Sequence, residues 1–550
     1  MEEALHDARR PAPPANPFRA REWVHVAGLV FVTALLRLVF LAGPVGSDDS
    51  RYLTAAWKLA HGQPAGAADV AYVRGAWIIW LAGWTWLGKS IAAILASQVV
   101  VSIGLVLTLY WLGRKLTGDS LAALLGALCW ALFPVELTYA GMLLPDQLGV
   151  LLAILAAGLA LSPFRAPAGQ TPWLQLIAAG ALCGLAVSVK EPYVFVPVIL
   201  GLWALLEIRP RRVGIERTFI FGAVSVATFA LEYLFFRLWT GDWIYRHRVL
   251  NVMYGPGGKI ASEEHVSWRS LIHYPREVIF NPEISGLFGW LLLIAVIYAL
   301  RKVNESKFIA LWSIVFFLFL QYGSTTLTRY QPLPMQPRYI QPMIILLFIP
   351  LGRWLADLVA SPSFGRIGTA LLLIAISLQG IMAVEAESAT GLYFANLPRA
   401  VERTLATRGK ELGCSVAIPL AVDTHLPPQL RDLTQCWPKI DLRRGFNPSD
   451  FEQLRDRKVA ILIPNDLARL SATRENYQAL KTWLDQNAHS VPIEDGETFL
   501  DRCYLASGVN ILRRHANTVA IANLYYFSDA AVVRLDARTS ISSCAWPCSL

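Results

Sequence analysis

The sequence is poor in charged residues. Asp, Glu, Lys and Arg make up 16% of its 550 residues, whereas a soluble domain of this size carries about a quarter. Apolar runs separated by short loops recur from Trp23 to about Val384. Because runs of this length can cross a bilayer, an ordinary soluble protein is excluded for this part of the chain.

Motifs that would assign a familiar soluble chemistry are also missing. The chain has no Walker-type phosphate loop, no dinucleotide-binding fingerprint and no convincing internal repeat. Its seven cysteines show none of the spacings of a metal site. The net charge of +9 comes mostly from basic residues in short loops, which act as membrane anchors, so it does not indicate nucleic-acid binding.

The apolar runs predict a polytopic α-helical membrane protein with about 11–13 spans. We expect spans near 23–42, 91–112, 120–134, 144–161, 173–188, 192–208, 217–239, 284–300, 307–322, 338–356 and 367–384. A further apolar stretch, Gly75–Gly88, is rich in Trp and too short to span, which is typical of an interfacial or re-entrant helix.

The composition divides the chain into four predicted regions. These are a cytoplasmic tail at 1–22, a transmembrane domain at 23–384, an extracytoplasmic α/β domain at 385–515 and a disordered tail at 516–550. In the third region, Val416–Pro419 and Val459–Pro464 resemble buried strands, and Arg474–Asn487 an amphipathic helix. An external compartment would permit one disulfide among its cysteines, whose pairing cannot be deduced: Cys414, Cys436 and Cys503.

Charge patterning predicts the topology. Basic residues gather in alternate loops, for example around Arg114, Arg165, Arg211 and Arg301. Short basic loops face the cytoplasm, so we expect a cytoplasmic N-terminus and an external C-terminal region in the plasma (inner) membrane. The opposite loops then hold nearly every carboxylate that adjoins a span. Acids and bases that meet at one membrane surface indicate a site.

Two adjacent carboxylates, Asp48 and Asp49, follow the first span and open a short amphipathic helix. Its apolar side chains share one face, and Gly62 is a plausible stop: Tyr52, Ala55, Ala56, Leu59 and Ala60. Carboxylates at a membrane boundary are expensive to desolvate and rarely serve packing. The alternative is that Ser47 or Asp48 only caps the helix.

The order of several motifs over about residues 30–350 resembles GT-C-type membrane glycosyltransferases. That group includes protein O-mannosyltransferases and the transferases that add aminoarabinose to lipid A, which are similar to bacterial glycosyltransferase family 39. The matching elements are Leu36-Arg37-Leu38, Asp48-Asp49-Ser50-Arg51-Tyr52, Pro134 through Asp146, Gly184 through Lys190, Thr240 through Tyr245, and Pro337-Arg338-Tyr339 with Pro342. The chain departs from the group at Asp49, where the named subfamilies have Glu.

The resemblance implies an enzyme that moves a hexose or pentose from a polyprenyl-phosphate carrier to an acceptor lipid, glycan or protein on the external face, with inversion. Asp48 matches the first acid of the signature and would take the acceptor's proton, with Asp49 beside it. Candidate cations for the donor phosphate lie on the same face: Arg74, Lys190, Arg246, Arg248 and Arg338. Supporting candidates are Arg51, Tyr52, Glu136, Tyr139, Asp146 and Tyr339.

Each candidate also has a structural interpretation. Lys190 could be an anchor or the partner of a carboxylate, and Glu136 and Asp146 could cap helices or pair with bases. Arg37 is expected to pair with a site carboxylate, and Arg246-His247-Arg248 could be a basic interfacial patch. A divalent metal between Asp49 and the phosphate stays open, although His247, His265 and His273 lack metal-ligand spacing.

Three other functions compete with this interpretation. A secondary transporter would also carry intramembrane charges such as Glu232, but transporters tend to show repeated halves and mid-membrane polar groups. A non-catalytic scaffold is the second alternative. The third is a ligase or polymerase that moves whole glycans from a lipid-diphosphate donor. The expected partners are a lipid-linked sugar, its acceptor and membrane lipids, with no nucleic acid.

Overall fold

The structure is a computed structural model. It describes residues 20–40, 48–65, 70–88, 91–167, 170–207, 211–254, 272–282, 284–302, 306–324, 333, 336–362, 365–391, 415–420, 440–444, 448–452, 459–464, 474–494 and 520–526. Most of the two predicted tails, all five cysteines from Cys414 onward and His265 lie outside these residues. Within the predicted tails, residues 20–22 begin a helix, and residues 520–526 form a strand where the sequence predicts disorder. Side chains are described for fewer residues, and that of Asp48 is not among them.

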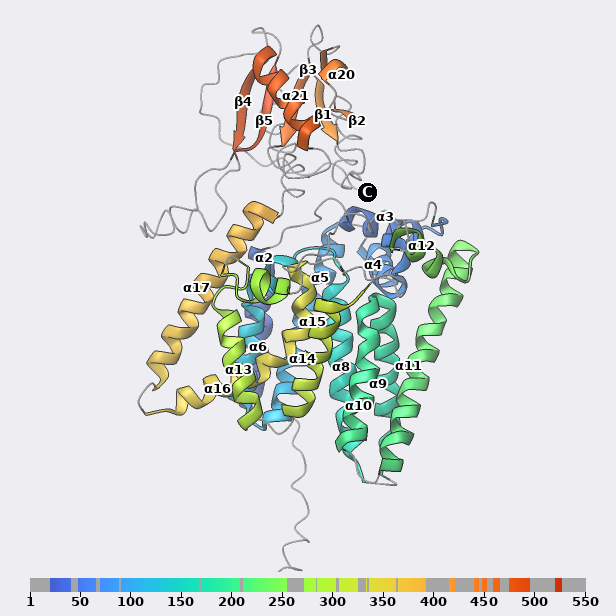
Figure 1. Cartoon of the computed structure of the whole chain (residues 1–550), viewed down its shortest axis with the longest axis vertical. Coiled ribbons are helices and arrows are strands. Elements are labelled where there is room, and N and C mark those ends of the chain that lie inside the picture. Colours follow the sequence, from blue (N-terminus) through green and yellow to red (C-terminus); the bar gives the residue numbers. More distant parts are fainter. Residues whose placement is uncertain are drawn as a thin grey trace, which may run out of the picture.

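Helices make up most of the described chain, as the sequence predicts. The long ones stand side by side in Figure 1 as a bundle, and the short ones α3, α4 and α12 lie together at its upper end. Their bounds are α2 Ala20–Val39, α3 Asp48–Ala60, α4 Gly75–Gly88, α5 Ile91–Thr117, α6 Ser120–Ala131, α7 Pro134–Ala140, α8 Asp146–Arg165, α9 Trp173–Val189, α10 Phe195–Glu207, α11 Arg211–Thr240, α12 Tyr245–Tyr254, α13 Phe288–Lys302, α14 Ser306–Tyr322, α15 Gln341–Ile344, α16 Phe348–Ala360 and α17 Gly365–Gly391.

Short 3-10 turns and one π-helical turn lie between several of these α-helices. They are η2 Val70–Val73, η3 Glu191–Val194, η6 Pro337–Ile340 and η7 Ile345–Leu347, together with the π-helical turn η5 Tyr274–Ile279. η3 and η6 lie at the entries to α10 and α15, and both begin with a proline in their first turn. A proline there removes no helical hydrogen bond and fixes the entry angle of the chain.

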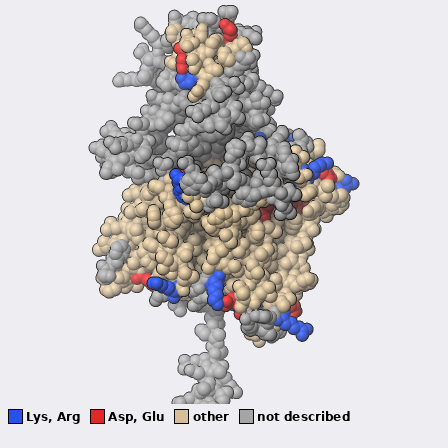
Figure 2. Space-filling model, viewed as in Figure 1, with Lys and Arg blue, Asp and Glu red and all other residues tan. Residues whose placement is uncertain are grey.

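The multi-span helical fold is confirmed, and each of the eleven expected spans coincides with helix in the structure. Four helices in the described part are long and apolar enough to cross a bilayer, and a bent pair would make a fifth. Four more apolar helices are shorter. The total of 11–13 spans therefore stays a prediction. On the face in Figure 2, charged residues lie near the two ends of the helical region, with an uncharged band between.

The bent pair, α6 and α7, brings a buried loop toward the site. The two helices meet at 59° across Leu132 and Phe133, and Pro134 begins α7. A proline at the first helical position starts a new helix and cannot continue the old one. The chain then passes through a short loop at 141–145 into α8, so the bend determines where Asp146 enters the bundle.

Two glycines explain local geometry that the site needs. Gly62 has φ of +65° two residues after α3, which confirms the predicted stop. Gly184, in the Gly-Leu-Ala motif, lies where a Cβ atom would be 2.4 Å from the carbonyl oxygen of Ser225. Only glycine allows α9 and α11 to pack this closely, and this packing sets the walls of a groove described below.

The described part of the C-terminal region contains a five-stranded sheet in the order β2-β1-β3-β5-β4. The strands are β1 Ser415–Leu420, β2 Ile440–Arg444, β3 Val459–Pro464, β4 His489–Glu494 and β5 Ala520–Tyr526, with helices α20 Pro448–Glu452 and α21 Arg474–Asn487. β1 pairs in parallel with β2 and β3, whereas β5 is antiparallel to β3 and β4. β1, β3 and α21 coincide with the elements expected from sequence, while the domain boundaries stay predictions.

Candidate active site

Seven charged side chains from six parts of the chain meet at one end of the bundle. We call them the ion-pair cluster: Arg74, Asp146, Lys190, Glu191, Glu232, Arg246 and Arg338. They come from the residue before α4, the start of α8, the α9–η3 junction, α11, α12 and η6. Each ion pair joins residues far apart in sequence or on different helices, so only the folded bundle can assemble the cluster.

Asp146 is the centre of one half of the cluster. Its carboxylate forms a short ion pair with Lys190 Nζ, and Arg338 Nε lies 3.7 Å from its second oxygen. Lys190 Nζ also lies 3.8 Å from the ring centroid of Tyr339, an arrangement in which a cation is attracted to an aromatic face. Tyr193 donates to the backbone oxygen of Asp146 at 3.0 Å and holds the start of α8 in place.

Glu191 is the centre of the other half. Arg74 Nη1 lies 3.1 Å from one carboxylate oxygen, and Arg246 Nη2 lies 2.9 Å from the other. Desolvation alone would raise the pKa of the Glu191 carboxyl, but the two guanidinium groups outweigh it and lower that pKa to about 2. Glu191 is therefore ionised at any physiological pH.

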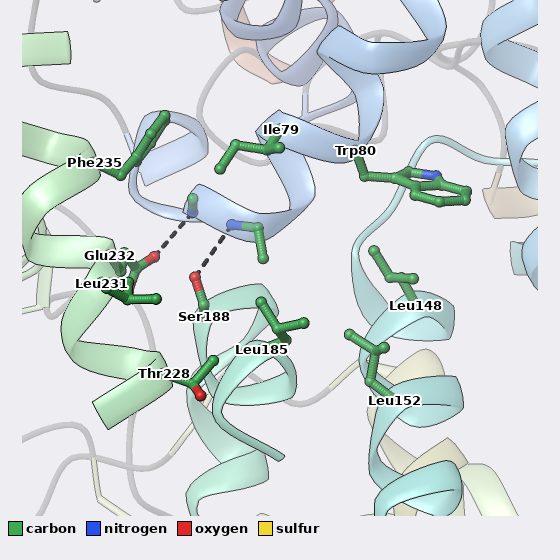
Figure 3. A pocket seen from close by; sticks show the side chains of 12 residues that line it. Ile79, Trp80, Leu148, Leu152, Leu185, Ser188, Thr228, Leu231, Glu232 and Phe235 are labelled. Atoms are coloured by element: carbon green, nitrogen blue, oxygen red, sulfur yellow. Dashed lines mark hydrogen bonds between the residues drawn. The ribbon is translucent and has the colours of Figure 1, made fainter. Parts of the chain in front are cut away.

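Glu232 connects the cluster to a groove. Arg246 Nη1 lies 2.6 Å from one of its oxygens, and the other accepts a hydrogen bond of 3.0 Å from the backbone N–H of Gly75. The groove has a volume of about 420 Å³ and is walled by α4, α8, α9 and α11. Figure 3 shows that most of the lining is apolar, with Glu232 and Ser188 bonded to the first turn of α4.

The groove faces the surroundings of the bundle. Leu231, one of its lining residues on α11, is 63% exposed, and other large apolar side chains on α11 are exposed as well. In a membrane these side chains contact lipid. The groove is therefore a mostly apolar cleft beside exposed apolar side chains, and Glu232 connects it to the ion-pair cluster.

The predicted catalytic pair begins α3, as expected. Asp48 is the first residue of this helix. The buried side chain of Asp49 accepts a hydrogen bond of 3.0 Å from the backbone N–H of Leu143, in the loop that leads into Asp146. Tyr52 packs edge to face against Trp77 of α4, with ring centroids 6.3 Å apart. The contact of Asp49 thus ties the start of α3 to the loop that leads into Asp146 of the ion-pair cluster.

Glu136 belongs to a separate network, deeper in the bundle. It forms an ion pair of 3.1 Å with Arg37, and both side chains are almost fully buried. Arg37 also donates to Ser102 Oγ at 2.7 Å, and Gln341 donates to Glu136 at 3.2 Å. The prediction that Arg37 pairs with a carboxylate is confirmed. This network links α2, α5, α7 and α15.

The remaining predicted residues lie around these groups. Arg248 points away from the cluster, because its side chain is 59% exposed and pairs with Asp242 at 2.7 Å. Tyr139 on α7 and Arg51 on α3 are both half-buried. Among the described residues, Arg248 contacts none of the other candidate cations, so its role in binding the donor phosphate stays a prediction.

The sequence places Glu191 on the external face beside Lys190, as one of its possible partners, but indicates no part in the site for Glu191 or Glu232. The only sequence signal for Glu191 is its position next to Lys190, and Glu232 stands out only as an acid inside an apolar run. Among the described residues, no group of three or more His, Cys, Asp or Glu is close enough to hold a metal ion. A metal beside Asp49 therefore stays a hypothesis, and nothing below depends on it.

One family model matches the chain, in its central region. Residues 73–234 match the family model described as dolichyl-phosphate-mannose-protein mannosyltransferase. No curated protein matches the chain. Among solved structures, ArnT from Cupriavidus metallidurans in the apo state has a TM-score of 0.49 and 16% identity, over 82% of this chain and 95% of that chain.

Two further structures show a similar degree of likeness or less. The oligosaccharyltransferase of Archaeoglobus fulgidus has a TM-score of 0.47 and 12% identity, over 83% of this chain and 71% of that chain. The Pmt1-Pmt2 complex of Saccharomyces cerevisiae has a TM-score of 0.35 and 21% identity, over 43% and 35%. For residues 73–234, the family match confirms the resemblance to GT-C membrane glycosyltransferases that the motifs indicate.

Proposed function

We propose that this protein transfers a sugar from a polyprenyl-phosphate carrier to an acceptor at the extracytoplasmic membrane surface. The observation that carries the proposal is the ion-pair cluster at the charged end of a lipid-facing groove. The family match at residues 73–234 supports the same chemistry. The sugar is a hexose or pentose, and the acceptor is a lipid, a glycan or a protein.

The donor phosphate would bind at the cluster. Its four cations, Arg74, Lys190, Arg246 and Arg338, exceed its three carboxylates by one. The surplus positive charge suits a phosphodiester, which carries one negative charge, and it stabilises the additional charge that develops as the phosphate leaves. Guanidinium groups bind phosphate oxygens well, and Arg74 and Arg246 already pair with the two oxygens of one carboxylate, so these two are the main binding groups.

The carrier's lipid tail would occupy the groove beside α11. Its apolar lining removes isoprenoid carbons from contact with charged groups, and Glu232 and Ser188 at its end are occupied by hydrogen bonds to α4. A tail in the groove would fix the phosphate at the cluster and the sugar near α3. Positioning of this kind lowers the activation barrier of the transfer because the reacting groups are already held close together in a suitable orientation.

Asp48 would act as the general base. It takes the proton from the acceptor hydroxyl as the hydroxyl oxygen attacks the anomeric carbon. The bond from that carbon to the phosphate oxygen breaks, and the electron pair leaves with the phosphate monoester. Asp49, bonded to Leu143, holds the start of α3 next to the cluster. Base and leaving group would lie on opposite sides of the sugar, which gives inversion.

The test is a transfer assay with purified protein and a polyprenyl-phosphate sugar, together with mass spectrometry of lipids and glycans from cells that lack the protein. Asp48→Asn should lower the rate about a hundredfold or more. A matched control is Asp119→Asn, which removes an acid near the α5–α6 turn and retains the helix cap there. Near-normal turnover by Asp48→Asn would reject this base, and transport without transfer would reject the function.

A further inference from the structure

Glu191 occupies the position between two guanidinium groups that a phosphate would take. Each of its carboxylate oxygens faces a different arginine, at 3.1 Å for Arg74 and 2.9 Å for Arg246. A phosphate presents two oxygens to two guanidinium groups in the same manner. Carboxylate and phosphate are therefore alternative occupants of one site.

The two arginines do not depend on Glu191 for their position. Arg246 donates to the backbone oxygens of Val187 and Ser188, at 3.2 and 3.5 Å, and pairs with the buried carboxylate of Glu232. Arg74 donates to the backbone oxygen of Val189 at 3.4 Å. The last turn of α9 thus keeps both guanidinium groups in place when the carboxylate of Glu191 moves away.

Glu191 is also the most accessible member of the cluster. Its side chain is 39% exposed, whereas those of Arg74 and Arg246 are each 10% exposed. It lies in η3, directly after Lys190, which caps the end of α9, so its side chain can rotate toward solvent without disturbing a long helix. A displaced carboxylate would be rehydrated, which limits the free energy that displacement requires.

We propose that Glu191 is an internal substitute for the donor phosphate, which occupies the two arginines in the ligand-free protein and is displaced when the carrier binds. The inference rests on the proposed function. It adds a physical consequence: the carboxylate competes with every phosphate at this site, so it weakens donor binding and speeds release of the polyprenyl-phosphate product. It also keeps two buried arginines paired between turnovers, when an unpaired charge would destabilise the fold.

The test is a binding titration of the full-length protein in detergent with farnesyl phosphate, a short polyprenyl monophosphate. Farnesol and inorganic phosphate serve as probes for the tail and the head alone. Glu191→Gln leaves the shape of the side chain but removes its charge, and we expect it to bind farnesyl phosphate about fivefold more tightly or better. The gain should be absent for farnesol and should disappear when Arg74→Gln is combined with Glu191→Gln.

The matched control is Glu207→Gln. Glu207 is 37% exposed and pairs with Lys307 at 2.7 Å, at the end of α10 away from the cluster. The control changes the net charge by the same amount, so its affinity for farnesyl phosphate should equal that of the wild type. If both variants gain affinity equally, general charge and not displacement explains the effect, and the inference is wrong.

The outcomes separate this inference from the function on which it rests. If wild-type protein binds farnesyl phosphate and folded Glu191→Gln binds it equally or more weakly, displacement is rejected and the donor site stands. If wild-type protein binds neither farnesyl phosphate nor a polyprenyl-phosphate sugar, the donor site and the inference both fail. Should Glu191→Gln not fold, Glu191→Asp replaces it. Its shorter carboxylate cannot reach both arginines, so we expect a smaller gain, and no gain would reject the inference.

Discussion

Removal of Lys190 should affect stability and donor binding in ways that can be measured separately. Its Nζ pairs with Asp146 inside the bundle and lies 3.8 Å from the ring centroid of Tyr339. Lys190→Met keeps an unbranched side chain of similar length but leaves the Asp146 carboxylate with Arg338 alone, at 3.7 Å. Both consequences follow from the loss of a single positive charge.

The expected magnitudes can be derived from these contacts. Breaking a buried ion pair by removing one partner costs about 3–5 kcal/mol. Because Arg338 still faces Asp146, we expect a value near the lower limit, about 3 kcal/mol. If Lys190 also binds the donor phosphate, the lost charge-assisted hydrogen bond costs about 1.5–3 kcal/mol of binding free energy. That corresponds to roughly a tenfold to hundredfold loss of donor affinity.

A double variant distinguishes the two roles. Lys190→Met combined with Asp146→Asn removes both charges, so most of the lost thermal stability should return while donor affinity stays low. Lys115→Met, a cation at the end of α5 that donates to the Gly158 backbone oxygen, is the control for loss of one lysine. Thermal unfolding in detergent and donor titration give the two quantities. If donor affinity of the double variant returns with its stability, Lys190 only stabilises the fold.

Three further predictions concern the rest of the helical region. Glu136→Gln leaves the buried charge of Arg37 unpaired and should lower the free energy of unfolding by about 3–5 kcal/mol, whereas replacement of both by neutral residues should recover part of it, as thermal unfolding will show. The pKa of Glu191 in the folded protein, about 2, lies below the unfolded value of about 4.3. Its contribution to stability is therefore constant above about pH 5 and is lost as the pH falls toward 2, so the difference in stability between wild type and Glu191→Gln should not change between pH 5 and 8. In a background without the native cysteines, membrane-impermeant labelling should modify new cysteines near Arg248 and at 400–500 but not near Arg212; external labelling near Arg212 would contradict the topology.

The helices could be predicted from sequence because each depends on local composition. The apolar stretch Gly75–Gly88 is a helix with these bounds, and the soluble pattern at Arg474–Asn487 gives a helix with the predicted ends. Turn and cap residues mark such limits within the segment itself, as Gly62 does after α3. A helix whose pattern is contained in one segment can therefore be predicted without knowing how the chain folds.

The contacts of the site could not be predicted in the same way. Lys190 and Asp146 are 44 positions apart, and Arg37 and Glu136 are 99 apart. Their pairing depends on how the helices pack, and no periodicity within a segment specifies that packing. Charge patterning predicts that these groups share one membrane face. It cannot distinguish Arg248, whose side chain points outward, from Arg246, whose side chain is buried in the cluster.

The ion pairs also bear on whether each cation of the cluster stabilises the fold or binds the donor phosphate. A buried guanidinium or ammonium group in a ligand-free protein needs a partner, so pairing by itself does not argue against phosphate binding. What differs is how readily the partner can leave. Glu232 and Asp146 are 3% and 5% exposed, and their carboxylates hold Arg246 and Lys190 from inside the bundle. Glu191 alone among the three carboxylates of the cluster can move into solvent, so an incoming phosphate would take its place and leave the other two pairs intact.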